Sequence, residues 1–283
     1  MRLGAPIFAK TPDPDELAQA HVEKGYRASY CRLGVNTPPE QVEAYRQAFA
    51  KHDVAIAEAN AMCISILNTD EAKRQEVIQQ IKGRLAFADK IGARCCVIHG
   101  GTVQPEGWGQ FTPENLSQDS FDRMVNVIQE IIDDVQPSEA RLGVEIEPYT
   151  LPDSPQVYRD LIDAIDRPGF GVHFDPVNTI ISPRTLAESG RWMQEYFDAV
   201  GPWIVSCHAK DLILDRGDGF RYGYKEVPPG EGFFDYEVFL KGVSELPLDP
   251  PMMIEHLKTE EEYDAARDFI LGVAERIGVD IMQ

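Results

Sequence analysis

The sequence has no long hydrophobic run and is poor in basic residues. No stretch approaches the 18 or so apolar residues of a membrane span, and the N-terminal M-R-L-G-A-P-I-F lacks the apolar segment of a secretion signal. Lysine and arginine total 27 against 47 aspartates and glutamates, so the formal net charge is −20. Such a polyanion repels nucleic acid and anionic membranes. We therefore expect neither as a partner, and we expect a small molecule and a metal cation instead.

Cysteine is also scarce, and phosphate-binding motifs are missing. The chain has five cysteines, an odd number, and Cys95, Cys96 and Cys207 fall inside apolar runs. Buried, reduced thiols in a cytoplasmic protein fit this pattern better than a disulfide framework. No Gly-rich phosphate loop follows the first strand-like run, which argues against a doubly wound open sheet. No arginine cluster marks a phosphate site either.

What the sequence does contain is a regular alternation of strand-like and helix-like patterns. The expected strands cover residues 2–8, 27–33, 54–61, 93–99, 142–147, 169–175, 203–211 and 252–255. The expected helices cover residues 13–24, 38–52, 70–91, 121–135, 155–165, 186–200, 236–246 and 261–277. Residues 212–234 are expected to form a long loop. Strand–helix units repeated in this way, with no linker, predict a single (β/α)8 TIM barrel over residues 1–283.

The strand predicted at 203–211 is apolar and turns polar only near its end. Alternation of side chains places Ile204, Ser206 and His208 on one face and Val205 and Cys207 on the other. The face that carries His208 is expected to point into the barrel.

Three other predicted strands end in a carboxylate, namely Glu147, Asp175 and Glu255. Because functional groups of such barrels lie at the carboxyl ends of the strands, we expect these three to meet His208. Clustered buried carboxylates need a compensating cation. Three carboxylates and one imidazole favour Mn²⁺, Mg²⁺ or Co²⁺ over a structural Zn²⁺ site. The alternative is four unrelated polar residues on the rim, some of them paired with lysine or arginine.

Five short motifs in the second half of the chain resemble the xylose isomerase-like barrel superfamily, in its sugar phosphate isomerase/epimerase branch. They are E-P at 147–148, D-P-V-N at 175–178, H-A-K-D at 208–211, P-P-G-E-G-F-F-D-Y at 228–236 and I-E-H at 254–256. They follow one another in the order of the family. The stretch from N-T-D-E-A-K-R to A-D-K-I-G-A at 68–93 extends the similarity toward the N-terminus.

The resemblance implies a function and a set of roles. Glu147, Asp175, His208 and Glu255 would bind a divalent metal, most simply Mn²⁺, with Mg²⁺, Co²⁺ or Zn²⁺ as alternatives. Glu147 and Glu255 would also exchange protons with a sugar or sugar derivative through an enediolate, as in an isomerase or epimerase. Relatives often form homo-oligomers, so the resemblance leaves a homo-oligomer open.

Other reactions of the same fold remain open. A lyase, either an inosose-type dehydratase or a 3-oxo-glycoside eliminase, would share the enediolate start. An endonuclease IV-like nuclease would need a basic surface, and a non-catalytic sugar-binding barrel would not need both glutamates. Lys210 and Asp211 depart from the ketose 3-epimerases, as does Asn178, which stands where those enzymes have histidine.

Four residues are expected to contact substrate: His99 at a strand end, Trp108 over a sugar ring, Asn178, and Lys210 on a substrate oxygen. The competing interpretation of Trp108 is packing within its own loop, and that of Lys210 is a salt bridge to Asp211 or another acid at the rim.

Three further residues receive a weaker assignment. Glu145 and His173 lie one layer below Glu147 and Asp175, where they either orient metal ligands or are core residues with satisfied hydrogen bonds. Glu58 near the end of the third strand is explained equally well by the polarity of a loop.

Overall fold

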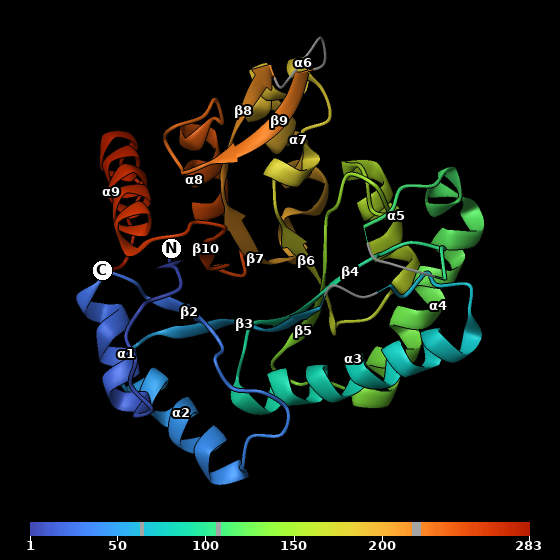
Figure 1. The fold of residues 1–283 in the computed structure, drawn as a ribbon, viewed down its shortest axis with the longest axis horizontal. Coiled ribbons are helices and arrows are strands. Elements are labelled where there is room, and N and C mark those ends of the chain that lie inside the picture. The colour runs from blue at the N-terminus through green and yellow to red at the C-terminus, as the bar shows by residue number, and fades with distance from the viewer. Residues whose placement is uncertain (63–64, 106–108, 217–221) are drawn as a thin grey trace.

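The computed structural model describes residues 1–62, 65–105, 109–216 and 222–283. Within these ranges eight parallel strands close into a barrel, in the order β1-β10-β7-β6-β5-β4-β3-β2, and helices surround it (Figure 1). The (β/α)8 TIM barrel predicted from the sequence is therefore confirmed. No helix in these ranges combines the length and apolar character that crossing a bilayer requires.

Most bounds lie within two or three residues of the predicted ones, but β1 and β2 are much shorter than the strands predicted at 2–8 and 27–33. The barrel strands are β1 (Leu3–Gly4), β2 (Ala28–Tyr30), β3 (Ala55–Met62), β4 (Cys95–His99), β5 (Arg141–Glu145), β6 (Phe170–Phe174), β7 (Ile204–Ala209) and β10 (Met252–Ile254). The α-helices are α1 (Pro14–Glu23), α2 (Pro39–Lys51), α3 (Glu71–Ile91), α4 (Gln118–Val135), α5 (Pro155–Ile165), α6 (Pro183–Ala187), α7 (Ser189–Val200), α8 (Tyr236–Ser244) and α9 (Glu260–Ile277). Short 3-10 turns are η1 (Pro113–Leu116), η2 (Val177–Thr179) and η3 (Gly201–Trp203).

Local signals in the sequence set the helix ends. The Asp70 side chain accepts hydrogen bonds from the amides of Ala72 and Lys73 at the start of α3. Gly92 ends the same helix with a φ of 75°, a left-handed conformation that glycine adopts without strain. The single helix predicted at 186–200 is two helices, α6 and α7, because the backbone of Glu188 leaves the helical conformation between them.

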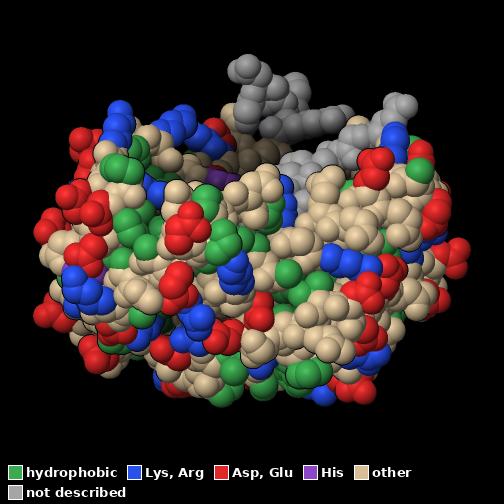
Figure 2. All heavy atoms as spheres, turned by 90° about the horizontal axis from the view of Figure 1, so that it is seen from below, with side chains coloured by type: hydrophobic (Ala, Val, Ile, Leu, Met, Phe, Trp, Pro, Cys, Tyr) green, Lys and Arg blue, Asp and Glu red, His purple; other side chains and the backbone are tan. Residues whose placement is uncertain are grey.

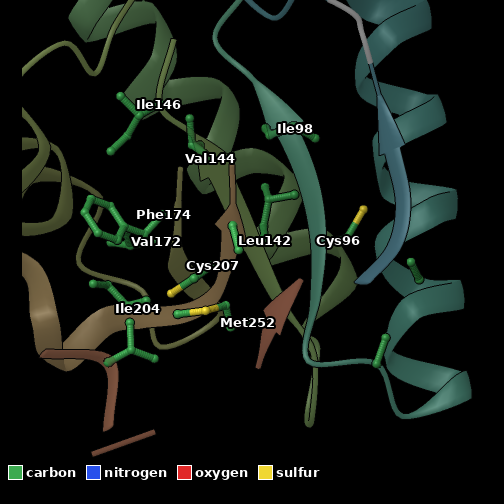
Figure 3. Close-up of a cluster of buried hydrophobic side chains, with 14 of the residues drawn as sticks. Cys96, Ile98, Leu142, Val144, Ile146, Val172, Phe174, Ile204, Cys207 and Met252 are labelled. Carbon is green, nitrogen blue, oxygen red and sulfur yellow. The ribbon is translucent and has the colours of Figure 1, made fainter. Parts of the chain in front are cut away.

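The main core lies between the barrel and its ring of helices. Leu142, Val144 and Ile146 from β5 and the residue beyond it point outward into this core, as do Val172 and Phe174 of β6 (Figure 3). All five side chains are buried. Because side chains alternate along a strand, the residues between them face the barrel interior.

Strand β7 departs from the predicted alternation in its first half. Its pairing with β6 shifts register, since Val172 lies opposite Ile204 and His173 lies opposite Ser206. The extra residue turns Ile204 outward into the main core (Figure 3) and places Val205 in a separate cluster with residues of β4. The prediction that Ile204 shares a face with Ser206 and His208 is therefore wrong, and so is the prediction that Val205 shares a face with Cys207.

A hairpin above the barrel mouth replaces part of the loop predicted at 212–234. Strands β8 (Asp211–Arg216) and β9 (Tyr222–Val227) pair antiparallel, from Asp211 opposite Val227 to Arg216 opposite Tyr222. The hairpin lies at the top of Figure 1. Most of β9 is exposed, so this strand lacks the apolar alternation by which a strand is recognised in sequence.

Candidate metal centre and active site

Four strand ends bring ionisable side chains to one point at the barrel mouth. Glu145 is the last residue of β5, Asp175 follows β6, His208 lies near the end of β7 and Glu255 follows β10. One ligand atom of each lies within 4.8 Å of the others, and we call these four residues the mouth group. Since neighbouring parallel strands end at the same rim, the fold itself produces this convergence.

The Nδ1 atom of His208 lies at the middle of the mouth group. It is 2.8 Å from Glu255 Oε1, 3.4 Å from Glu145 Oε1 and 3.5 Å from Asp175 Oδ2. Glu145, Asp175 and His208 are buried, and the side chain of Glu255 is 15% exposed. Three carboxylates and one imidazole therefore surround a small volume at the rim of the barrel.

Glu145 takes the place in this group that the sequence assigned to Glu147. Strand β5 ends two residues earlier than predicted. Side chains two residues apart on a strand share a face and lie about 7 Å apart along it. Glu147 instead forms a second group with His99 and Glu145, in which its Oε1 lies 3.9 Å from His99 Nε2. Asp175, His208 and Glu255 meet as expected, with Glu145 as their fourth member.

The mouth group fits a divalent cation by its donor set and by an unsatisfied atom. His208 Nδ1 is buried and makes no hydrogen bond of acceptable geometry to any residue in the described ranges. A buried polar atom without a hydrogen bond is costly, and a cation held by the same four side chains would remove that cost. The oxygen-rich set matches Mn²⁺, Mg²⁺ and Co²⁺.

Lys210 reaches the mouth group from the end of β7. Its Nζ atom lies 2.7 Å from Glu255 Oε1 and 2.8 Å from Asp175 Oδ2, and the side chain is buried. Burial acts to lower the pKa of Lys210, but the charges of Asp175, Glu255 and Glu226 raise it, so the side chain is an ammonium ion. Of the two interpretations of Lys210, the structure shows the salt bridge, to Asp175 and Glu255 and not to Asp211.

His99 and Asn178 both contact Glu145. His99 Nε2 lies 2.9 Å from Glu145 Oε2, and the Asn178 side-chain amide donates to Glu145 Oε1 at 3.3 Å. These two predicted substrate residues thus lie beside the mouth group. Trp108, another of the four predicted substrate residues, lies outside the described residues.

The family of the chain follows from comparison with known proteins. The sequence model of the xylose isomerase-like TIM barrel family matches residues 19–272. The chain belongs to this family. No curated protein matches the sequence significantly.

Solved structures of this fold come from enzymes with different reactions. D-psicose 3-epimerase from Clostridium cellulolyticum with D-tagatose has a TM-score of 0.70 at 10% identity, over 99% of this chain and 100% of its own. The probable 3-DHS dehydratase AsbF from Bacillus anthracis has a TM-score of 0.69 at 18% identity, over 98% of this chain and 100% of its own. Endonuclease IV from Thermus thermophilus has a TM-score of 0.72 at 14% identity, over 98% of this chain and 100% of its own. At these identities the similarity shows the shared fold alone. Two further structures of this fold contain magnesium and zinc.

In this xylose isomerase-like barrel, the charge states at the mouth depend on burial and on mutual contacts. Burial acts to lower the pKa of His208, but the neighbouring carboxylates, Glu58 first, raise it well above its usual value. Burial acts to raise the pKa of Glu145, but the imidazoles of His208 and His99 hold it well below its usual range. Burial and the charge of Glu145 raise the pKa of Glu147 to about 7. Glu147 can therefore gain or lose a proton near neutral pH.

Asp211 anchors the segment at residues 230–234, which follows strand β9. Its carboxylate accepts hydrogen bonds from the amides of Leu212, Gly230, Gly232 and Phe234, at 2.8 to 3.1 Å. A Cβ atom on Gly232 would lie 2.1 Å from Asp211 Oδ1, so this approach requires glycine. The turn that contains Gly230 and Gly232 is thus anchored on Asp211, the residue after Lys210.

A cavity opens from the mouth group toward solvent, between β9 and the residues after β10. Its volume is about 240 Å³, and Lys210, Glu226, Glu255 and His256 contribute to its lining. His256 Nδ1 lies 2.8 Å from Glu226 Oε2, so the hairpin and the end of β10 are joined across the cavity wall. A small polar molecule in this cavity would contact Lys210 and Glu255 directly.

Two residues near His208 were not identified from the sequence, namely Glu58, which was explained by loop polarity, and Tyr30. Glu58 is 3% exposed and lies inside the barrel under His208, where loop polarity cannot explain it. Its signal is an acid within the small apolar run A-I-A-E-A. Tyr30 on β2 lies with its ring 6.4 Å from that of His208, and its buried hydroxyl has no hydrogen-bond partner among the described residues. Nothing in the local pattern of Tyr30 distinguishes it from a core tyrosine.

Proposed function

We propose that the protein is a divalent-cation-dependent isomerase or epimerase of a sugar or sugar derivative. The observation that carries the proposal is the mouth group, in which Glu145, Asp175 and Glu255 surround His208 Nδ1 beside an open cavity. We propose Mn²⁺ as the cation, because the set has three oxygen donors and one nitrogen donor; Mg²⁺, Co²⁺ and Zn²⁺ are the alternatives.

The residues beside the mouth group supply proton transfer. A bound cation would polarise a substrate carbonyl and so make the neighbouring C–H acidic. Glu147 and Glu255 follow strands β5 and β10, with β6 and β7 between them, so they approach a substrate from different sides of the mouth. One carboxylate removes the α-proton to give an enediolate, and the other returns a proton. Return from the opposite face epimerises that carbon, and return to the neighbouring carbon isomerises.

Lys210 and Asn178 hold the carboxylates in place during these steps. The Lys210 ammonium contacts Asp175 and Glu255, and the Asn178 amide contacts Glu145. His99 lies between Glu145 and Glu147, at 2.9 Å and 3.9 Å, and so can influence which of them carries a proton. These contacts support roles in positioning for residues that the sequence assigned to substrate binding.

A lyase is the second candidate, and the position of Lys210 favours it. An ammonium 2.7 Å from Glu255 at the cavity wall can stabilise the negative charge that develops on a leaving oxygen, while the carboxylate that removed the α-proton returns it to that oxygen. Loss of a β-hydroxyl or an aglycone would then complete an elimination. The substrate could be an inosose or a 3-oxo-glycoside.

Nucleic acid is a poor partner for this surface. The net charge is −20, and Figure 2 shows acidic and basic side chains interspersed over the face that it presents. A nuclease draws its affinity from phosphate contacts with a basic surface. We therefore propose a small-molecule substrate, although endonuclease IV has the same fold.

Metal analysis and isotope exchange test the proposal together. Protein purified without chelator should contain about one equivalent of divalent metal, and Mn²⁺ added to chelator-treated protein should raise its melting temperature. Incubation with a panel of ketoses and sugar derivatives in D₂O should place deuterium at the epimerised or isomerised carbon. Release of water or aglycone, seen by mass spectrometry, would assign the lyase. Absence of bound metal together with an unchanged melting temperature would refute the cation site.

A further inference from the structure

Beneath the mouth group lies a buried polar cluster that substrate cannot reach, formed by Glu58 of β3, His173 of β6 and Ser206 of β7. We call these three residues the inner cluster. Their exposed fractions are 3%, 0% and 0%. A buried carboxylate is costly in a barrel interior, where apolar side chains could fill the same space. The inner cluster therefore calls for an explanation beyond packing.

Glu58 accepts hydrogen bonds from three directions. Ser206 Oγ donates to Glu58 Oε1 at 2.5 Å, His173 Nε2 lies 3.0 Å from the same oxygen, and His208 Nε2 lies 3.3 Å from Glu58 Oε2. An ionised carboxylate can only accept, so both imidazoles must present N–H groups at Nε2. Its contact with His208 thus decides which nitrogen of that ring carries a hydrogen.

The other side of the His208 ring faces the mouth group. Nδ1 lies within 3.5 Å of carboxylate oxygens of Glu145, Asp175 and Glu255. With the hydrogen fixed on Nε2 by Glu58, the neutral ring offers a lone pair at Nδ1 to a cation. His173 packs edge-on against the His208 ring, with centroids 4.2 Å apart, and so limits its rotation.

We propose that Glu58 is a positioning residue that fixes the tautomer and the orientation of His208, so that Nδ1 serves as the nitrogen ligand of the mouth group. Contacts of this kind to a ligating imidazole typically contribute about 10- to 100-fold to metal affinity. The inference rests on the proposed cation site and is independent of the reaction that the site carries out.

Replacing Glu58 by glutamine tests the tautomer directly. Glutamine has the same shape but offers one acceptor and one donor where Glu58 offers two acceptors. Two donors, from His173 and Ser206, converge on the Oε1 position, so the amide oxygen fits there and the NH₂ group faces His208. His208 Nε2 must then accept, which places the hydrogen on Nδ1 and removes the ligand lone pair.

The first measurement is calorimetric titration of Mn²⁺ and Co²⁺ into chelator-treated protein. Glu58→Gln should bind both metals about 10- to 100-fold more weakly than wild type. Ser206→Ala, which removes a Glu58 contact that does not reach His208, should stay within about threefold of wild type, as should the exposed Glu275→Gln. Equal affinity of Glu58→Gln and wild type would overturn the inference, and so would an equal loss in Ser206→Ala.

The second measurement does not depend on the folding of any Glu58 variant. In ¹⁵N-histidine-labelled wild-type protein loaded with Zn²⁺, the His208 signals, assigned by their loss in His208→Gln, should show a protonated Nε2 and an unprotonated Nδ1. A proton on Nδ1 would overturn the inference while leaving the cation site intact. Wild-type protein that binds no divalent metal would refute both the inference and the proposed function.

Discussion

Asp175 is the mouth-group residue whose replacement best separates cation binding from folding. Asp175→Asn keeps the Oδ1 atom that accepts from the Val177 amide but removes the charge beside His208 and Lys210. Because outer-shell changes alone cost about 10- to 100-fold, loss of this carboxylate should weaken Mn²⁺ binding by more than about 100-fold. Calorimetric titration measures the change in Mn²⁺ affinity. Asp198→Asn, the same change on the exposed side of α7, should bind Mn²⁺ like wild type.

Glu147→Gln distinguishes a proton-transfer role from a ligand role at that position. The structure places Glu147 with His99, outside the mouth group, so the variant should keep its Mn²⁺ affinity within about threefold of wild type. Loss of an acid/base group should slow deuterium incorporation into substrate by about 100-fold or more. Titration and exchange can be followed on the same preparation. Loss of Mn²⁺ binding in this variant would make Glu147 a ligand and contradict the arrangement described above.

At the scale of elements, the hairpin and the segment after it should depend on one glycine. A Cβ atom at Gly232 would collide with Asp211 Oδ1, whereas a Cβ atom at Gly223 on β9 would meet nothing within 4 Å. Gly232→Ala should therefore lower the free energy of unfolding by about 1–3 kcal/mol. It should also expose the segment around 230–234 to faster amide exchange. Denaturant unfolding and hydrogen exchange measure the two effects. A loss of the same size in Gly223→Ala would show that the Asp211 anchor is not the cause.

Not all elements could be predicted equally well. The 3.6-residue period and the capping residues of α3 mark that helix in the sequence, because they act within one segment. The hairpin of β8 and β9 escaped prediction, because its strands pair with each other above the barrel and bury little apolar surface. The register shift at Ser206 also escaped, because a bulge is defined by the neighbouring strand, β6.

At the scale of the whole molecule, His21 should make stability depend on pH. Burial in α1 lowers its pKa to about 4, below the ordinary value of about 6.5. Between these values the unfolded chain binds more protons than the folded protein, so stability falls as pH falls from about 6.5 through about 4. The full loss amounts to about 3 kcal/mol. His21→Leu should show a correspondingly smaller pH dependence in denaturant unfolding. An unchanged slope would contradict the assignment.

The sequence by itself determined the barrel and the strand ends at which its ionisable side chains gather. Strand and helix periods are local properties, and a repeated strand–helix unit leaves few topologies open, so the positions of Asp175, His208 and Glu255 at one rim follow from the chain alone.

Tertiary structure alone decided which side chains lie at the same level along the barrel axis. Alternation shows that Glu145 and Glu147 share a face, but the level of each depends on where β5 ends relative to β6 and β7, which barrel closure sets. Glu58 contacts His208 across the interior from a strand 150 residues away in sequence. No local pattern records such a contact, because the hydrogen bond that gives Glu58 its partner exists only once the barrel is closed.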